Sequence, residues 1–236
     1  MKLSRKDFVT AAAIGASASV LSPQSIAAAP SAQPSPRALH FHVLGLHEYD
    51  YAGMMRTLAQ QRSHKQVFQV SGAILLAPGV ASAYIHMQNS MNAHEFSLGY
   101  GRGSLATLAV LMGPPVILSL KDAMWTKYGF GSVFNLEQTN TYYRASSLRF
   151  SGDPDDANAI YQDWSAQAVM ARGGAFMVCH NALTYVASIF ASRSGQSTDA
   201  VLAEFTANML PGYAMVPAGV AAVQLAQQHG WTLFAL

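Results

Sequence analysis

The chain has 236 residues, 51% of them hydrophobic and 10% aromatic, a composition that excludes disordered and collagen-like proteins and allows a sizeable core. Its 14 basic and 12 acidic residues give a formal charge of +2, and no run of Lys or Arg builds the basic surface of a nucleic-acid-binding protein. A charged fraction of only 11% indicates that a second subunit covers part of the apolar surface, so we expect a homo-oligomer.

The N-terminus resembles an export signal. Residues 4–9 (SRKDFV) are similar to the twin-arginine motif, with Lys6 in place of the second arginine, and residues 11–21 form a mildly apolar stretch. We expect residues 1–29 to be removed as a signal peptide, which leaves a periplasmic protein without a stable membrane span. The alternative is a short membrane anchor, although a spanning helix needs about 20 apolar residues.

A leader separates this signal from the folded part. Residues 30–38 contain two prolines among Ser, Ala and Gln, which is typical of a flexible segment. We expect residues 39–236 to form one domain. It begins with a short N-terminal helix over 51–61, where apolar residues fall at helical spacing.

Strands and helices then alternate. Residues 67–73 predict a strand, and a helix follows with apolar positions from Tyr84 to Leu98. The near-continuous apolar run over 105–112 is typical of a strand covered on both faces. Gly113 and two prolines then introduce a helix that we expect to end near residue 128.

The middle of the chain is less regular. Residues 129–151 show no clear period, so we interpret them as an insertion. Asp153 followed by Pro154 predicts a helix start, because Asp favours the N-cap position and Pro fits the first helical position. A third buried strand is predicted over 175–179, and a helix follows it over 181–190.

The last part predicts two more helices and two more strands. The helices cover 198–209 and 218–229, and the strands cover 213–216 and 231–236. Strands separated by helices throughout favour the α/β class. We therefore expect a three-layer αβα domain with a mostly parallel sheet of about five strands, similar to flavodoxin.

One cysteine lies where the third strand meets its helix. In open parallel sheets, ligands bind at the carboxyl ends of the strands, where the N–H groups of helix N-termini point. Cys179 would lie at such a helix start, which favours the thiolate, and His180 and Asn181 would supply a proton acceptor and a donor. Alternatively, the thiol is buried packing or pairs between chains, because a single cysteine forms no internal disulfide.

Two stretches resemble the DsrE/DsrF-like sulfur-relay family. Residues 168–183 look like the family's helix, strand and cysteine-bearing turn, and residues 210–220 with 227–231 are similar to its closing segment. A helix containing Asn92 and the strand over 105–113 extend the similarity to most of residues 65–236. The chain departs from the family in its His180, where many relatives have Asn, and in the insertion over 129–151.

The resemblance implies a DsrE-like fold in which Cys179 carries sulfur as a persulfide, so that the protein acts as a sulfur carrier or sulfurtransferase. A small sulfur donor or a partner protein thiol would be its partner, and no cofactor is expected. Cys179, His180 and Asn181 are then the predicted catalytic residues. The ligand crevice beside them is predicted to contain Asn92, Gly113, Pro217 and Gly219.

Two other classes of function stay open. The first is a non-catalytic module of the same fold that binds a small molecule or a metal ion through His40 and His42, or through Met87, Met91 and His94. Because Met at helical spacing is more typical of a core, we assign no metal ligand. The second is an oligomeric interaction protein without chemistry.

Overall fold

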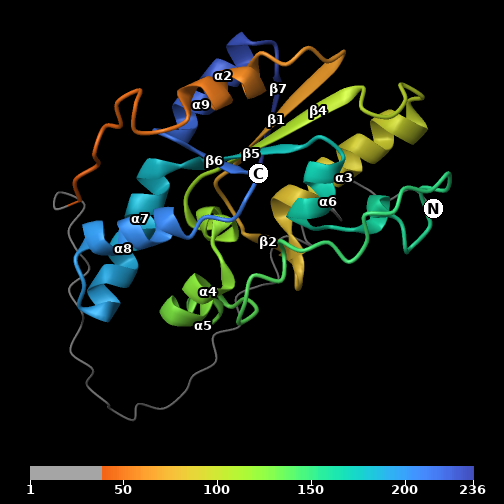
Figure 1. Ribbon diagram of the computed structural model, residues 1–236. Coiled ribbons are helices and arrows are strands. Elements are labelled where there is room, and N and C mark those ends of the chain that lie inside the picture. The colour runs from red at the N-terminus through yellow and green to blue at the C-terminus, as the bar shows by residue number, and fades with distance from the viewer. Residues whose placement is uncertain (1–38) are drawn as a thin grey trace, which may run out of the picture. The chain divides into compact units, whose positions relative to one another are not determined.

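Five parallel strands form the central sheet of the part of the chain that the computed structural model describes, residues 39–236 (Figure 1). The order across the sheet is β6-β5-β4-β1-β7, and every neighbouring pair is parallel. The predicted α/β class and five-stranded sheet are confirmed. The strands are β1 (His64–Val70), β4 (Leu105–Leu111), β5 (Ala175–Cys179), β6 (Tyr213–Val216) and β7 (Thr232–Ala235).

β4, the middle strand of the sheet, is fully buried and pairs with β1 along its whole length. All seven residues of β4 are buried, as its continuous apolar run predicts. β1 pairs with it from His64 opposite Leu105 to Val70 opposite Leu111. The prediction for β1 was therefore three residues too late, because its first three residues are polar yet still pair with β4.

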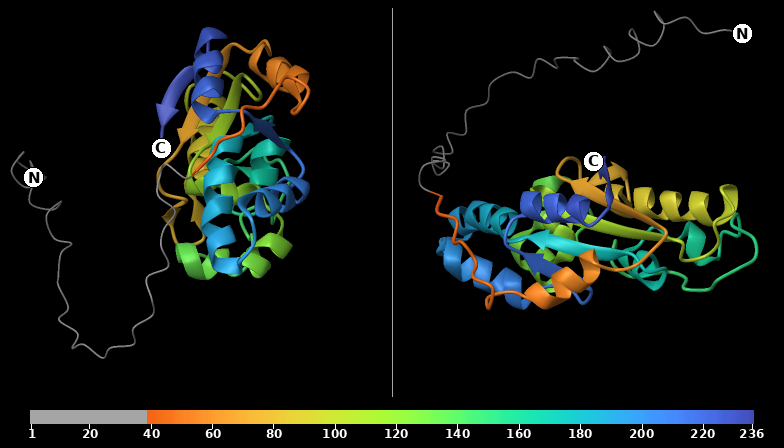
Figure 2. Two further views of the ribbon diagram at one scale, coloured as in Figure 1. Left: turned by 90° about the vertical axis from the view of Figure 1, so that its left-hand side faces the viewer. Right: turned by 90° about the horizontal axis from the view of Figure 1, so that it is seen from above.

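Helices cover both faces of the sheet, as the views in Figure 2 show. Because side chains alternate along a strand, Phe68 and Val70 enter one core whereas Val67 enters the other. The larger core is covered by α3 (Ser82–Asn92), α4 (Asp122–Tyr128), α5 (Phe130–Phe134), α6 (Ala166–Ala171), α7 (His180–Ser194) and α8 (Thr198–Ala207). The opposite core is covered by α2 (Tyr51–Leu58) and α9 (Gly219–Gln228).

The helix predicted between Gly113 and residue 128 consists of two pieces. A 3-10 helix, η3 (Pro114–Ser119), is followed by α4, with Leu120 extended between them. Leu120 forms an isolated antiparallel bridge with Met209, and Asn140 donates hydrogen bonds to the carbonyls of Leu118 and Leu120. These contacts satisfy backbone groups that a continuous helix would otherwise pair.

The helix predicted to begin at Asp153 is absent from the structure. Instead, the chain is irregular up to a short 3-10 helix, η4 (Ile160–Gln162), and the following α6 is capped by Ser165. The Asp153 carboxylate accepts a hydrogen bond from the N–H of Asp155, and Asp156 does the same for Asn158, each at 2.9 Å. Such local turns compete with helix formation.

Two further features complete the described part. A small antiparallel hairpin, β2 (Leu75–Ala77) and β3 (Val80–Ala81), lies between β1 and α3 and was not predicted. α3 continues into a π-helix, η2 (Ala93–Ser97).

The predicted signal and leader, residues 1–38, lie outside the described residues. Within residues 39–236, no helix has the length and apolar character needed to cross a bilayer.

Candidate functional site

The connections that leave β5 and β6 diverge to opposite faces of the sheet. β5 leads into α7, which packs in the larger core, whereas β6 leads into α9, which packs in the opposite core. β5 and β6 are neighbours in the sheet, and Cys179 is paired with Val216 at their carboxyl ends. A crevice between diverging connections is where open α/β sheets bind ligands.

Cys179 is both the last residue of β5 and the N-cap of α7. Its sulfur accepts a hydrogen bond from the N–H of Ala182 at 3.4 Å, so it is directed at the first turn of the helix. The residue is only 7% exposed, and it belongs to the core beneath α9 together with Met112 and Val216. The predicted helix start is confirmed, but the thiol is also packed among apolar side chains.

Three predicted crevice residues lie at the same edge as Cys179. A Cβ atom on Gly219 would stand 2.3 Å from Met112 side-chain atoms and 3.1 Å from the Cβ of Cys179, so the start of α9 rests against the cysteine. Gly113 follows the end of β4 with a φ of 60°, and Pro217 directly follows β6.

His180, the residue after the cysteine, has a buried imidazole. The residue is 5% exposed, and its Nδ1 has no hydrogen-bond partner. Burial lowers the pKa of His180, and the charge of nearby His42 acts in the same direction, whereas the neighbouring Asn181 side chain opposes it. An unpartnered buried nitrogen costs free energy, so this ring is available for a further contact.

The segment before α2 contributes residues that the sequence did not place here. The imidazole of His42 lies 2.9 Å from the Glu48 carboxylate, and Glu48 also accepts a hydrogen bond from the N–H of Gly45 at 2.7 Å. That backbone bond and His42 lower the pKa of Glu48. The charge of His42 lowers the pKa of His180 and that of Glu48 raises it, whereas His42 and His40 are not part of a group of three or more side chains arranged to hold a metal ion among residues 39–236.

Asn92 does not join this crevice, which corrects the sequence-based placement. It is the last residue of α3, a helix that starts after the carboxyl end of β1 and ends before the amino end of β4. Its side chain donates to the carbonyl of Tyr161 at 3.0 Å and accepts from Arg172 at 2.5 Å. Asn92 therefore lies at the amino edge of the sheet, opposite to Cys179.

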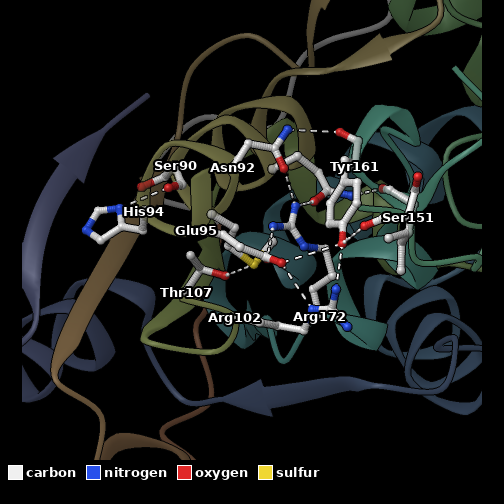
Figure 3. A network of polar contacts seen from close by, with 12 residues as sticks. Ser90, Asn92, His94, Glu95, Arg102, Thr107, Ser151, Tyr161 and Arg172 are labelled. Carbon is white, nitrogen blue, oxygen red and sulfur yellow. Dashed lines mark hydrogen bonds and ion pairs between the residues drawn. The ribbon is translucent and has the colours of Figure 1, made fainter. Parts of the chain in front are cut away.

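Asn92 is part of a buried polar network, drawn in Figure 3, that we call the Arg172 network. Arg172 is 3% exposed at its side chain and forms an ion pair of 3.1 Å with Glu95, which is 9% exposed. Glu95 also pairs with Arg102 at 3.1 Å, and Tyr161 accepts a hydrogen bond from Arg102 at 2.9 Å. The Tyr161 hydroxyl also donates to the carbonyl of Ser151 at 3.0 Å, so the network joins the end of the predicted insertion to α3 and η2.

The methionines proposed as metal ligands are structural. Met87 is fully buried in the larger core, and the Met91 sulfur lies 3.8 Å from the hydroxyl of Thr107. His94 points elsewhere and packs against His64 and Tyr100. Among residues 39–236, no group of three or more His, Cys, Asp or Glu side chains is arranged to hold a metal ion.

The carboxyl ends of β5 and β6 bring a thiol to the N-terminus of a helix. The sulfur of Cys179 accepts a hydrogen bond from the first turn of α7, and the next residue, His180, has a ring nitrogen without a hydrogen-bond partner. Comparison with known proteins does not narrow this further: no family model matches the sequence, and neither the curated proteins nor the solved structures contain a match.

Proposed function

We propose that the protein is a periplasmic sulfur carrier of the DsrE-like kind, with Cys179 as the sulfur-bearing residue. The observation that carries the proposal is the position of its sulfur, which accepts a hydrogen bond from the first turn of α7 where two connections diverge. The resemblance of residues 168–183 to the cysteine-bearing turn of that family supports it independently.

The transfer step is an exchange at sulfur. The Cys179 thiolate attacks the outer sulfur of a donor persulfide, a new S–S bond forms to Cys179, and the S–S bond of the donor breaks. The donor leaves as a thiolate and takes up a proton from solvent, so the reaction involves no net oxidation. The product is Cys179 persulfide, which a partner thiol removes by the same exchange.

The surroundings of Cys179 offer hydrogen-bond donors to sulfur. The N–H of Ala182 already points at the sulfur, and the positive end of the α7 dipole lies there. The free Nδ1 of His180 offers a second contact to a group held in the crevice. Because Cys179 is only 7% exposed, the donor reaches it when neighbours move, and the start of α9 at Gly219 is one such neighbour.

Mass spectrometry tests this function directly. The full-length protein is incubated with glutathione persulfide, and intact mass and peptide mapping then follow the addition of one sulfur atom. We expect the adduct on the Cys179 peptide, its removal by a small thiol, and no adduct on Cys179→Ser. A folded wild-type protein that gains no sulfur under these conditions would overturn the proposal.

A second candidate, a non-catalytic small-molecule-binding module, is favoured by a different observation. A pocket of about 600 Å³ lies between residues 73–79 and residues 134–137, with Tyr142 in its wall. Apolar side chains such as Ile74 and Phe134 line it, while polar atoms contribute about half of its exposed surface, a mixture that suits a small organic ligand. Titration with a thiol reagent separates the two functions: a thiol that reacts only after denaturation favours this module over the sulfur carrier.

Location and assembly belong to the same proposal. Residues 4–9 support export to the periplasm, and the low charged fraction supports a homo-oligomer. Exposed apolar side chains support the assembly further, among them Val43 before α2 and Leu233 and Phe234 on the edge strand β7. Cell fractionation of wild type and Arg5→Gln tests the first expectation, and sedimentation of the purified protein tests the second.

A further inference from the structure

We propose that His64 and His94 form a binding site for a divalent transition-metal ion at the amino edge of the sheet. His64 is the first residue of β1, and His94 lies in the π-helix η2 that extends α3. Their ring centroids are 5.3 Å apart, and Tyr100 packs against both rings. Neither histidine belongs to the Cys179 crevice, which lies at the opposite edge.

The hydrogen bond of His94 presents one nitrogen as a ligand. Its Nδ1 lies 2.9 Å from the carbonyl oxygen of Ser90, and because a carbonyl only accepts, Nδ1 must carry the proton. The neutral ring then has its lone pair on Nε2, and Figure 3 shows that edge turned away from the Arg172 network. Metal-binding histidines commonly have their other nitrogen fixed in this way.

The spacing of the two rings fits a shared ion. Imidazole nitrogens bind zinc at about 2.0–2.1 Å, and for a tetrahedral angle this places the two ring centroids roughly 5 Å apart. The observed separation is 5.3 Å, with the ring planes at 60° to each other. The separation of the two rings therefore matches that of two imidazoles on one ion.

The surroundings decide which ions suit the site. His64, Gln66 and His94 line a pocket of about 320 Å³, so water can fill the remaining coordination positions, whereas the amide oxygen of Gln66 accepts a hydrogen bond from Ser90 at 2.5 Å. Lys65 lies in the same wall, but its ammonium group donates to the carbonyl of His229 and lies 5.9 Å from the Trp231 ring centroid, on the other face of the sheet. Two imidazoles favour Zn²⁺, Ni²⁺ or Cu²⁺ over Mg²⁺ or Ca²⁺.

Calorimetric titration of the untagged full-length protein with NiCl₂ and with ZnCl₂ tests the site. We expect a single ion to bind in the wild type and the affinity to fall roughly tenfold or more in His64→Gln and in His94→Gln, because even an outer-shell change has such an effect. His86→Gln and His42→Gln are matched controls: His86 packs against Phe234, and His42 pairs with Glu48. Both controls should bind as the wild type does.

Two outcomes would overturn the site: a wild type that binds neither ion, or binding that both His64→Gln and His94→Gln leave unchanged. Circular dichroism of each variant establishes that it is folded. Should a variant fail to fold, NMR of the wild type replaces it, with the imidazole signals of His64 and His94 expected to shift on addition of Zn²⁺ and unshifted signals counting against the site. Persulfide formation at Cys179 is independent of all these results.

Discussion

Replacing Arg172 by methionine should destabilise the fold more than replacing an exposed charged residue would. Arg172 is 3% exposed and donates hydrogen bonds to Gln88 at 2.6 Å, to Asn92 at 2.5 Å and to Glu95 at 3.1 Å. Methionine retains much of the apolar stem but none of the donors. The three acceptors then remain in a buried position with fewer partners, which is the main source of the loss.

The magnitude follows from the remaining contacts. Removing one partner of a buried ion pair costs about 3–5 kcal/mol. Glu95 keeps its 3.1 Å pair with Arg102, so the lower end applies, about 3 kcal/mol. For a protein of this size, each kcal/mol shifts Tm by about 2–4 °C, which gives a decrease of roughly 6–12 °C.

Urea unfolding followed by circular dichroism measures this difference, with Arg102→Met as the matched control. Arg102 shares the same carboxylate, but its side chain is 55% exposed, so its loss should cost about 1 kcal/mol or less. The reasoning would be refuted if Arg172→Met and Arg102→Met lost equal stability. It would also be refuted if the denaturant midpoint of Arg172→Met matched that of the wild type.

Two further predictions concern the crevice. Gly219→Ala places a methyl group 2.3 Å from Met112, so we expect a loss of about 1–3 kcal/mol and faster alkylation of Cys179, whereas Gly152→Ala, which meets open space, should change neither. Burial lowers the pKa of His180 in the folded protein. As the pH falls below about 6.5, the unfolded chain therefore binds a proton at His180 more readily than the folded protein does, and the free energy of unfolding decreases. His180→Gln should lose less Tm than the wild type between pH 7 and 5, and parallel pH profiles would contradict this.

The sequence predicted the parts of the fold that depend on local pattern. β5 and β6 have the predicted bounds, because each is a short run between a glycine-containing turn and a helix start. The helix expected at Asp153 was wrong because the same carboxylates that favour an N-cap also form local turns with Asp155 and Asn158. Composition alone cannot decide between these two uses.

Contacts between residues far apart in the sequence limit how much of the candidate site could be predicted. The placement of Cys179, Gly113 and Gly219 at one edge follows from the parallel direction of the strands, which the alternation of strands and helices predicts. Asn92 was misplaced because the length of α3 carries it to the other edge. Glu95 and Arg172 are 77 residues apart, so no sequence period predicts their ion pair. The position of Arg172 directly before a Gly-Gly turn and a buried strand could have indicated that its side chain is buried.

The position of β7 has a consequence for how the protein reaches its native state. β7, which spans residues 232–235, pairs with β1, the first strand of the sheet, so β1 acquires its second neighbour only after residues 232–235 have left the ribosome. Such long-range pairing slows folding and leaves β1 unpaired on one side during synthesis. Until then β1 presents an edge of unpaired backbone N–H and C=O groups, which can pair with another extended chain.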